Sequence, residues 1–370
     1  MQSLPSLSNT TMTSPAKPVK AGRLYTIEFL RIWLMSCVFI VHAMSGRPAF
    51  RNWALSLVHS SSEYFNYAVE CFFIIGGFFL YKRLVACNAP FQIIRKTYMR
   101  LLPALLFAYI ILILACTRDI WHFPALLAMT QGIGFHGMPI GAGDYYCGVY
   151  FWVTVLFVGL FAYSPKKGWL GLIILIYITL MFRINAKPGG SNKDWLNFYT
   201  FIGKDLCRGI FSMGIGVIAG FLSERIKLSR KTPVRIFFTG FEALCLLGLF
   251  NYIVRPKHVH FSYYEMEVLF ALLLISISLS QGYISAFFNR IHQVMYVSRY
   301  VYPAFVGQMI TMGIIRKYNN FGWNEWYSAT FVICGGILLG IIEYHLVEKY
   351  LLPKILNYFK PSEKEDIFAS

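Results

Sequence analysis

Residues 26–45 read TIEFLRIWLMSCVFIVHAMS, an apolar run of membrane-spanning length that carries two ionisable groups, Arg31 and His42. An ionised Arg near the middle of a spanning helix costs about 3 kcal/mol even on lenient insertion scales. At about 100° and 1.5 Å per residue, Arg31 and His42 return to nearly the same helix face, roughly 16 Å apart. Such residues usually face a protein interior and mark a functional site. We therefore expect both side chains to line one interior channel, near its opposite ends.

The composition of the whole chain indicates the same environment. Hydrophobic residues make up 57% of the 370 residues and charged residues only 14%, with a mean hydropathy of +0.54. A soluble domain is typically about half apolar and a quarter charged, so this composition indicates a polytopic membrane protein. The net charge of +17 is therefore not interpreted as nucleic-acid binding, because the Lys and Arg residues lie mostly in loops between apolar segments.

Further apolar segments follow the first, each near the roughly 20 residues needed to cross a bilayer. They predict an all-α bundle of about ten transmembrane helices. The expected segments are 26–45, 65–81, 101–117, 147–163, 168–184, 203–222, 236–254, 264–281, 299–315 and 327–346.

The distribution of basic residues predicts the orientation. Placing the N-terminus in the cytoplasm puts most of the 34 Lys and Arg residues on the cytoplasmic side, as the positive-inside rule requires. An even number of segments also puts the C-terminus inside. We expect an integral protein of the cell inner (plasma) membrane, with a polar, disordered tail at 1–22, a membrane domain at 23–355 and a short cytoplasmic tail at 356–370. Residues 1–22 lack the apolar core of a cleaved signal peptide.

Two features suggest metal or disulfide chemistry at first sight. The eight cysteines are scattered through apolar segments without zinc-type spacing, so we interpret most of them as small buried residues. The loop at 255–260 contains His258 and His260, but no third ligand lies near them in sequence. No metal site is expected.

Several motifs together resemble the membrane acyltransferase-3 family. Residues 27–31 (IEFLR), followed by ten residues and His42, resemble its opening motif with Glu28 in place of Asp. Residues 69–78 (VECFFIIGGF) resemble its second helix, and residues 94–103 (IRKTYMRLLP) resemble the start of its third helix, where Thr97 replaces a frequent Arg. Residues 298–302 (SRYVY) and 343–353 (EYHLVEKYLLP) resemble its last two helices.

The resemblance implies an integral membrane enzyme that moves acyl groups, usually acetyl, onto extracytoplasmic glycans. Acetyl-CoA is then the donor substrate, and lipid, acyl-CoA and a glycan acceptor are the expected partners, with no nucleic acid and no metal.

The chemistry of such a transfer assigns roles to individual residues. A base must take the hydroxyl proton, and His42 is suited to this because its ordinary pKa is near 6.5. Arg31 is expected to recognise phosphate or carbonyl groups, and Glu28, one turn earlier, is expected to pair with it. Glu70 is expected to orient His42 or to hold Arg31. Arg95, Lys96 and Arg100 are expected to bind the CoA phosphates, and Asp144 and Tyr145 to contact the acceptor.

Simpler interpretations remain open for these residues. The basic groups are also explained as positive-inside anchors, His42 as a core histidine bonded to a neighbouring helix, and Glu70 as a helix-packing residue. Two other functions remain open. A secondary transporter also places Arg and His inside a membrane, although we find no paired broken helices in matching halves. The second open function is that of a catalytically inactive interaction protein of the same fold.

Overall fold

The structure is a computed structural model in which residues 24–58, 67–86, 89–116, 120–131, 133, 145–185, 204–226, 231–254, 263–318 and 323–358 are described. These residues form helices and turns, with no strand among them, which confirms the all-α prediction. The tails at 1–22 and 359–370, together with Asp144, His258 and His260, lie outside the described residues.

Each expected segment corresponds to a long helix. Seven described helices are long and apolar enough to cross a membrane, so the number of spans stays a prediction. The long helices are α1 (Tyr25–Met44), α3 (Ala68–Ala86), α4 (Pro90–Cys116), α6 (Tyr145–Tyr163), α7 (Pro165–Asn185), α9 (Lys204–Arg225), α10 (Thr232–Val254), α11 (Tyr263–Leu279) and α14 (Val301–Tyr318). The last continuous helical stretch runs through α15 (Glu325–Thr330), a π-helical segment (Phe331–Gly335), α16 (Gly336–Glu343), a second π-helical segment (Tyr344–Leu351) and α17 (Leu352–Tyr358).

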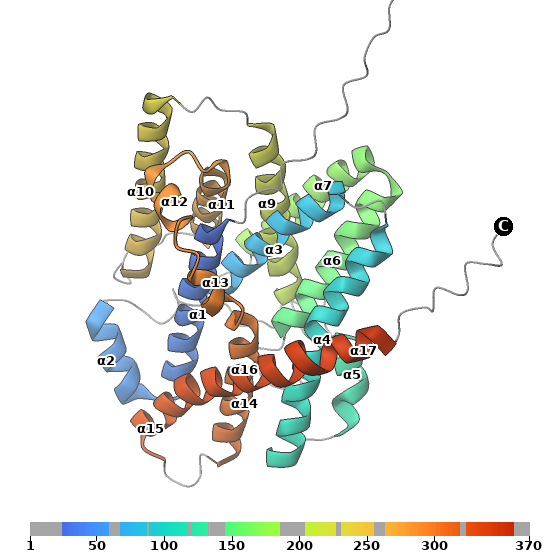
Figure 1. The fold of residues 1–370 in the computed structure, drawn as a ribbon, viewed down its shortest axis with the longest axis vertical. Coiled ribbons are helices and arrows are strands. Elements are labelled where there is room, and N and C mark those ends of the chain that lie inside the picture. Colours follow the sequence, from blue (N-terminus) through green and yellow to red (C-terminus); the bar gives the residue numbers. More distant parts are fainter. Residues whose placement is uncertain are drawn as a thin grey trace, which may run out of the picture.

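Shorter helices connect the long ones. They are α2 (Pro48–Val58), α5 (Phe123–Leu127), α12 (Tyr283–Phe288) and α13 (Val294–Ser298). Figure 1 shows α1 in the middle of the bundle, with α3 and α14 beside it and α15–α17 running across one side. The central position of α1 places Arg31 and His42 inside the protein.

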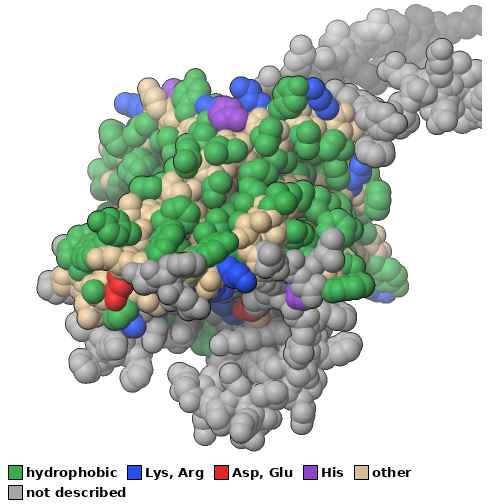
Figure 2. All heavy atoms as spheres, turned by 90° about the horizontal axis from the view of Figure 1, so that it is seen from below, with side chains coloured by type: hydrophobic (Ala, Val, Ile, Leu, Met, Phe, Trp, Pro, Cys, Tyr) green, Lys and Arg blue, Asp and Glu red, His purple; other side chains and the backbone are tan. Residues whose placement is uncertain are grey.

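Hydrophobic side chains remain on the outside of the bundle. Leu114 is 79% exposed and Phe91 is 74% exposed, and many other large apolar residues are also exposed. Seen from below, the surface is dominated by hydrophobic side chains (Figure 2). A soluble protein rarely exposes this much apolar surface, whereas lipid-facing helices require it.

Glycine allows the closest helix contacts. A Cβ on Gly77 of α3 would overlap the backbone of Met213 in α9, and one on Gly216 of α9 would overlap the backbone of Ile74. In the same way, a Cβ on Gly307 of α14 would overlap the carbonyl oxygen of Gly336 in α16. Small residues at helix crossings are typical of membrane bundles, where close van der Waals packing holds helices together.

Both ends of α1 are tied to the rest of the protein. At its N-terminus, the Thr26 hydroxyl donates to the Ser285 carbonyl oxygen (3.0 Å) and to Oδ1 of Asn289 (2.9 Å). At its C-terminus, buried Arg47 donates to the carbonyl oxygens of His42 (3.1 Å) and Ala43 (3.0 Å). These contacts satisfy carbonyls that a helix end leaves unpaired, and they fix the turn that carries His42.

Burial also affects the guanidinium of Arg47. Loss of water around the side chain lowers its pKa from the ordinary value, and the charge of Glu325 opposes this effect. Glu325 in turn accepts hydrogen bonds from the backbone N–H groups of Ala49 (2.6 Å) and Phe50 (3.3 Å) at the start of α2. The turn after His42 is therefore attached to α2 and α15.

Candidate active site

A cavity of about 380 Å³ lies between α1, α3, α4, α6 and α14. This volume is within the range of small-molecule sites. Its polar lining comprises Glu28, Arg31, Arg83, Thr97, Arg100, Tyr146, Tyr150 and Tyr302. Its apolar lining comprises Met35, Val38, Val69, Phe72, Ile75, Gly76, Phe79, Leu101, Val301 and Phe305.

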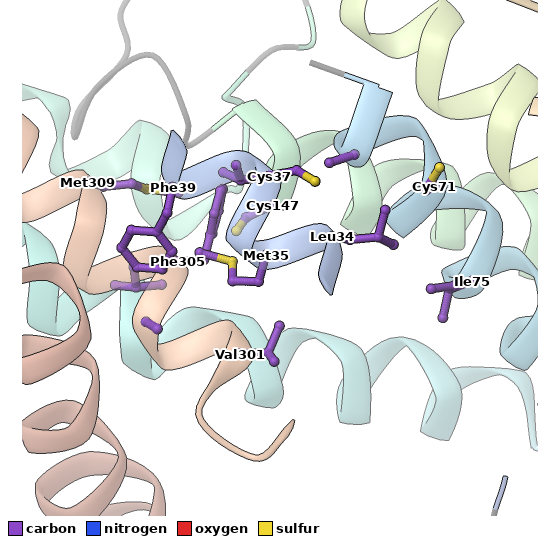
Figure 3. Close-up of a cluster of buried hydrophobic side chains, with 14 of the residues drawn as sticks. Leu34, Met35, Cys37, Phe39, Cys71, Ile75, Cys147, Val301, Phe305 and Met309 are labelled. Carbon is purple, nitrogen blue, oxygen red and sulfur yellow. The ribbon is translucent and has the colours of Figure 1, made fainter. Parts of the chain in front are cut away.

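The cavity is polar at one end and apolar along the rest. On α1, Glu28 and Arg31 come first, and Met35 and Val38 follow at helical spacing on the same face. On α14, Val301 and Phe305 line the cavity, and the edge of the Phe305 ring faces the Tyr146 ring from α6, with centroids 5.8 Å apart. Figure 3 shows Met35, Phe39 and Phe305 filling the space between α1 and α14. This arrangement suits a ligand with an anionic head and a less polar arm.

Arg31 is where the sequence predicted it. Its Nη1 donates to Oε2 of Glu28 at 2.7 Å, which confirms the expected local pair and directs the guanidinium along the cavity wall. Tyr146 lies close enough to both Arg31 and Arg100 for their charges to interact with its hydroxyl group. Two helices that are far apart in sequence thus bring their arginines to one tyrosine.

His42 differs from the expectation in one respect. It continues the face of Glu28, Arg31, Met35 and Val38, but it is not among the residues that line this cavity. The cavity ends at Val38, one turn before His42. The physical reason is packing, because Phe305 lines the cavity one turn before Gln308 on α14, and Gln308 lies at the level of His42. A single open channel from Arg31 to His42 is therefore not what this structure shows.

Beyond the end of the cavity, His42 lies beside Gln308 of α14. Among the described residues, Nδ1 of His42 is buried and has no hydrogen-bond partner, and neither do Nε2 and Oε1 of Gln308. The structure therefore places the imidazole next to an amide of a neighbouring helix without forming the expected hydrogen bond through this nitrogen.

Glu70 has a different partner from the one expected. Its Oε1 accepts from Nη2 (2.7 Å) and Nε (2.9 Å) of Arg208 in α9, and Arg208 also donates to Asp205 (3.0 Å). Glu70 therefore pairs with Arg208 and not with Arg31 or His42, since α3 packs along α9 and presents its acid to that helix. Its other oxygen, Oε2, is buried and has no hydrogen-bond partner among the residues that the structure describes.

The remaining predicted residues fall into two groups. Arg100 lines the cavity, whereas Arg95 and Lys96 are exposed on α4 and do not line it. Tyr145 lies against Arg208, with the guanidinium carbon 5.7 Å from the ring centroid, and it does not line the cavity either. The roles of Arg95, Lys96, Asp144 and Tyr145 stay predictions.

Sequence reasoning missed several cavity residues. Arg83 is not among the site residues expected from the sequence, yet it lines the cavity, and it forms no ion pair with a described residue. Tyr146 and Tyr150 lie four residues apart on α6, and this spacing signals a common helix face. Tyr302 belongs to the SRYVY motif, and its hydroxyl donates to the Leu101 carbonyl oxygen at 2.8 Å.

Comparison with known proteins agrees with the motifs. A family model described as an acyltransferase domain matches residues 24–345, which is most of the chain. This is the family that the motifs in α1, α3, α4 and α14 resemble. Neither the comparison with curated proteins nor the comparison with solved structures gave a match.

Proposed function

Because the chain belongs to the acyltransferase domain family, we propose that it moves an acetyl or similar acyl group from cytoplasmic acyl-CoA to a hydroxyl of an extracytoplasmic glycan. The observation that carries the proposal is the cavity, which gathers Arg31, Arg83 and Arg100 at a polar end and stops one turn from His42. A membrane acyltransferase needs a donor site and a base close to each other, and this arrangement supports that assignment.

The polar end of the cavity suits the nucleotide of the donor. Guanidinium groups bind phosphate through charge-assisted, often paired hydrogen bonds. Glu28 forms an ion pair with Arg31, whereas Arg83 and Arg100 form no ion pair with a described residue. The charge of Glu348 interacts with Arg100 without forming such a pair. We therefore assign phosphate binding chiefly to Arg83 and Arg100, and carbonyl recognition to Arg31.

The apolar part of the cavity suits the acyl-bearing arm. Val38, Phe72, Ile75 and Phe305 offer no hydrogen bonds, so they suit the acyl chain and the methylene groups of the arm, which need none. In this placement the thioester lies near the Val38 end, one turn from the imidazole of His42.

In the proposed acyl transfer, one bond to the acyl carbon forms while another breaks. Nε2 of His42 takes the proton of the acceptor hydroxyl while that oxygen bonds to the thioester carbon. The carbon–sulfur bond breaks, and the thiolate of CoA takes up one proton while His42 releases one. The products are a glycan ester and free CoA thiol. Direct transfer needs no covalent acyl-enzyme.

The test measures acyl transfer in membranes that contain the protein. We expect His42→Ala and His42→Gln to reduce turnover by about 10²- to 10⁴-fold, the usual contribution of a general base. Acyl-CoA should still raise the melting temperature of both variants, because the donor cavity does not include His42. Full turnover of the variants would exclude His42 as the base. If acyl-CoA leaves the melting temperature of the wild-type protein unchanged, the protein is not an acyl-CoA enzyme.

A further inference from the structure

Hydrogen bonding within the described part of the protein does not explain why the polar side chain of Gln308 is fully buried. It is 0% exposed, and neither its amide oxygen nor its amide nitrogen has a hydrogen-bond partner in the part of the chain that the structure describes. Buried polar groups are nearly always paired, because an unpaired one keeps the full cost of losing water. An unpaired amide next to a proposed base therefore indicates a functional group.

Close packing fixes the position of Gln308. A Cβ on Gly336 of α16 would lie 3.0 Å from the Cα atom of Gln308, so only a small residue allows this approach. Gly307, the preceding residue, also packs against the backbone of Gly336. Held against α16 in this way, α14 brings the amide of Gln308 next to the imidazole of His42 on α1.

The imidazole needs a partner of the kind that Gln308 offers. A histidine that uses Nε2 as a base carries its proton on Nδ1, and the group bonded to Nδ1 selects this tautomer. Among the described residues, Nδ1 of His42 is buried and unpaired, and the Gln308 amide, with its oxygen also unpaired, lies beside the ring. A hydrogen bond between these two atoms would give each of them a partner.

We propose that Gln308 is a positioning residue whose amide oxygen accepts the Nδ1–H of His42 and so leaves Nε2 free to take the acceptor proton. This inference rests on the proposed function, because it assigns a partner to the proposed base. Groups that orient a catalytic histidine in this way are typically carboxylates or amides.

The experiment compares variants that keep or remove the acceptor. Gln308→Met preserves the length of the side chain without an acceptor and should lower kcat about 10- to 100-fold, with KM for acyl-CoA unchanged. Gln308→Glu retains an acceptor oxygen and should restore much of kcat. The matched control is Gln131→Met, since Gln131 is also buried with both amide atoms unpaired but does not line the cavity. It should leave kcat unchanged.

A double variant distinguishes a role of Gln308 in positioning His42 from a general effect of Gln308 on the stability of the protein. If Gln308 acts through His42, adding Gln308→Met to His42→Ala should cause little further loss of kcat, because the two residues act as one unit. A folded Gln308→Glu protein as slow as Gln308→Met would overturn the inference, as would wild-type kcat in Gln308→Met. Both outcomes leave the proposed function standing if His42→Ala remains inactive. Active His42→Ala would instead exclude His42 as the base, and with it this role of Gln308, while acyl transfer itself would stand.

Discussion

Val38 and His42 lie one helical turn apart on the same face of α1, and of the two only Val38 lines the cavity. The end of the cavity therefore lies between these two residues. On one side are the arginines and the space for a ligand, and on the other are the imidazole and the buried amide of Gln308. In the proposed reaction, the donor reaches this boundary from one side and the acceptor from the other.

Replacing the cavity arginines should weaken donor binding. We expect Arg83→Gln and Arg100→Gln each to raise KM for acyl-CoA about 10- to 100-fold with little change in kcat, because each loses a charge-assisted hydrogen bond worth about 1.5–3 kcal/mol. Steady-state kinetics in detergent measure both constants. The control is Arg225→Gln at the end of α9, an exposed arginine that does not line the cavity. Equal effects of all three variants would indicate a general effect of surface charge.

Glu70 should prove to be a stabilising residue. Its carboxylate is buried and paired with Arg208, so Glu70→Ala leaves the guanidinium with Asp205 as its one ion-pair partner among the described residues. Breaking a buried pair from one side costs about 3 kcal/mol or more, and we expect a clear fall in the melting temperature of the detergent-solubilised protein.

The double variant identifies the cause of that fall. Glu70→Ala combined with Arg208→Met removes both charges, so it should recover part of the lost stability. If Glu70→Ala instead melts like the wild type but loses turnover, the acid takes part in the chemistry, as the sequence suggested.

The crossing of α3 and α9 gives a second test of the fold. Gly77→Ala puts a methyl group into the backbone of Met213, so we expect a large loss of folded protein in size-exclusion chromatography. Gly159→Ala on α6 is the matched control, because no atom lies within 4 Å of the added carbon. There, alanine should stabilise the helix slightly, by up to about 1 kcal/mol. Normal yields of the Gly77 variant would show that α3 and α9 do not pack this closely.

The part of the site that lies along one helix was predictable from the sequence. Helical spacing put Arg31 and His42 on one face and Glu28 beside Arg31, and the basic start of α4 pointed to Arg100. The partner of Glu70 was not predictable, because Arg208 lies on α9, and no pattern along either helix specifies which two helices pack together. The end of the cavity at Val38 has the same origin, since the ring that fills the space comes from Phe305 on α14.

Phe305 should control whether water reaches the donor from the His42 side. Its ring lines the cavity and packs against Tyr146, so Phe305→Ala removes the main side chain between the cavity and the turn that carries His42. We expect acyl-CoA hydrolysis without any acceptor to rise several-fold, because water then meets the thioester next to the base. Release of free CoA thiol measures this reaction directly.

A loss of packing alone should not have this effect. Removing a buried phenyl ring costs about 3–5 kcal/mol of stability wherever it lies. Phe270→Ala therefore serves as the control, since Phe270 on α11 is buried in the same cluster but does not line the cavity. It should lower the melting temperature to a similar extent while hydrolysis stays at the wild-type rate. If both variants hydrolyse acyl-CoA equally fast, the increase comes from loosened packing, and Phe305 does not separate the donor from His42.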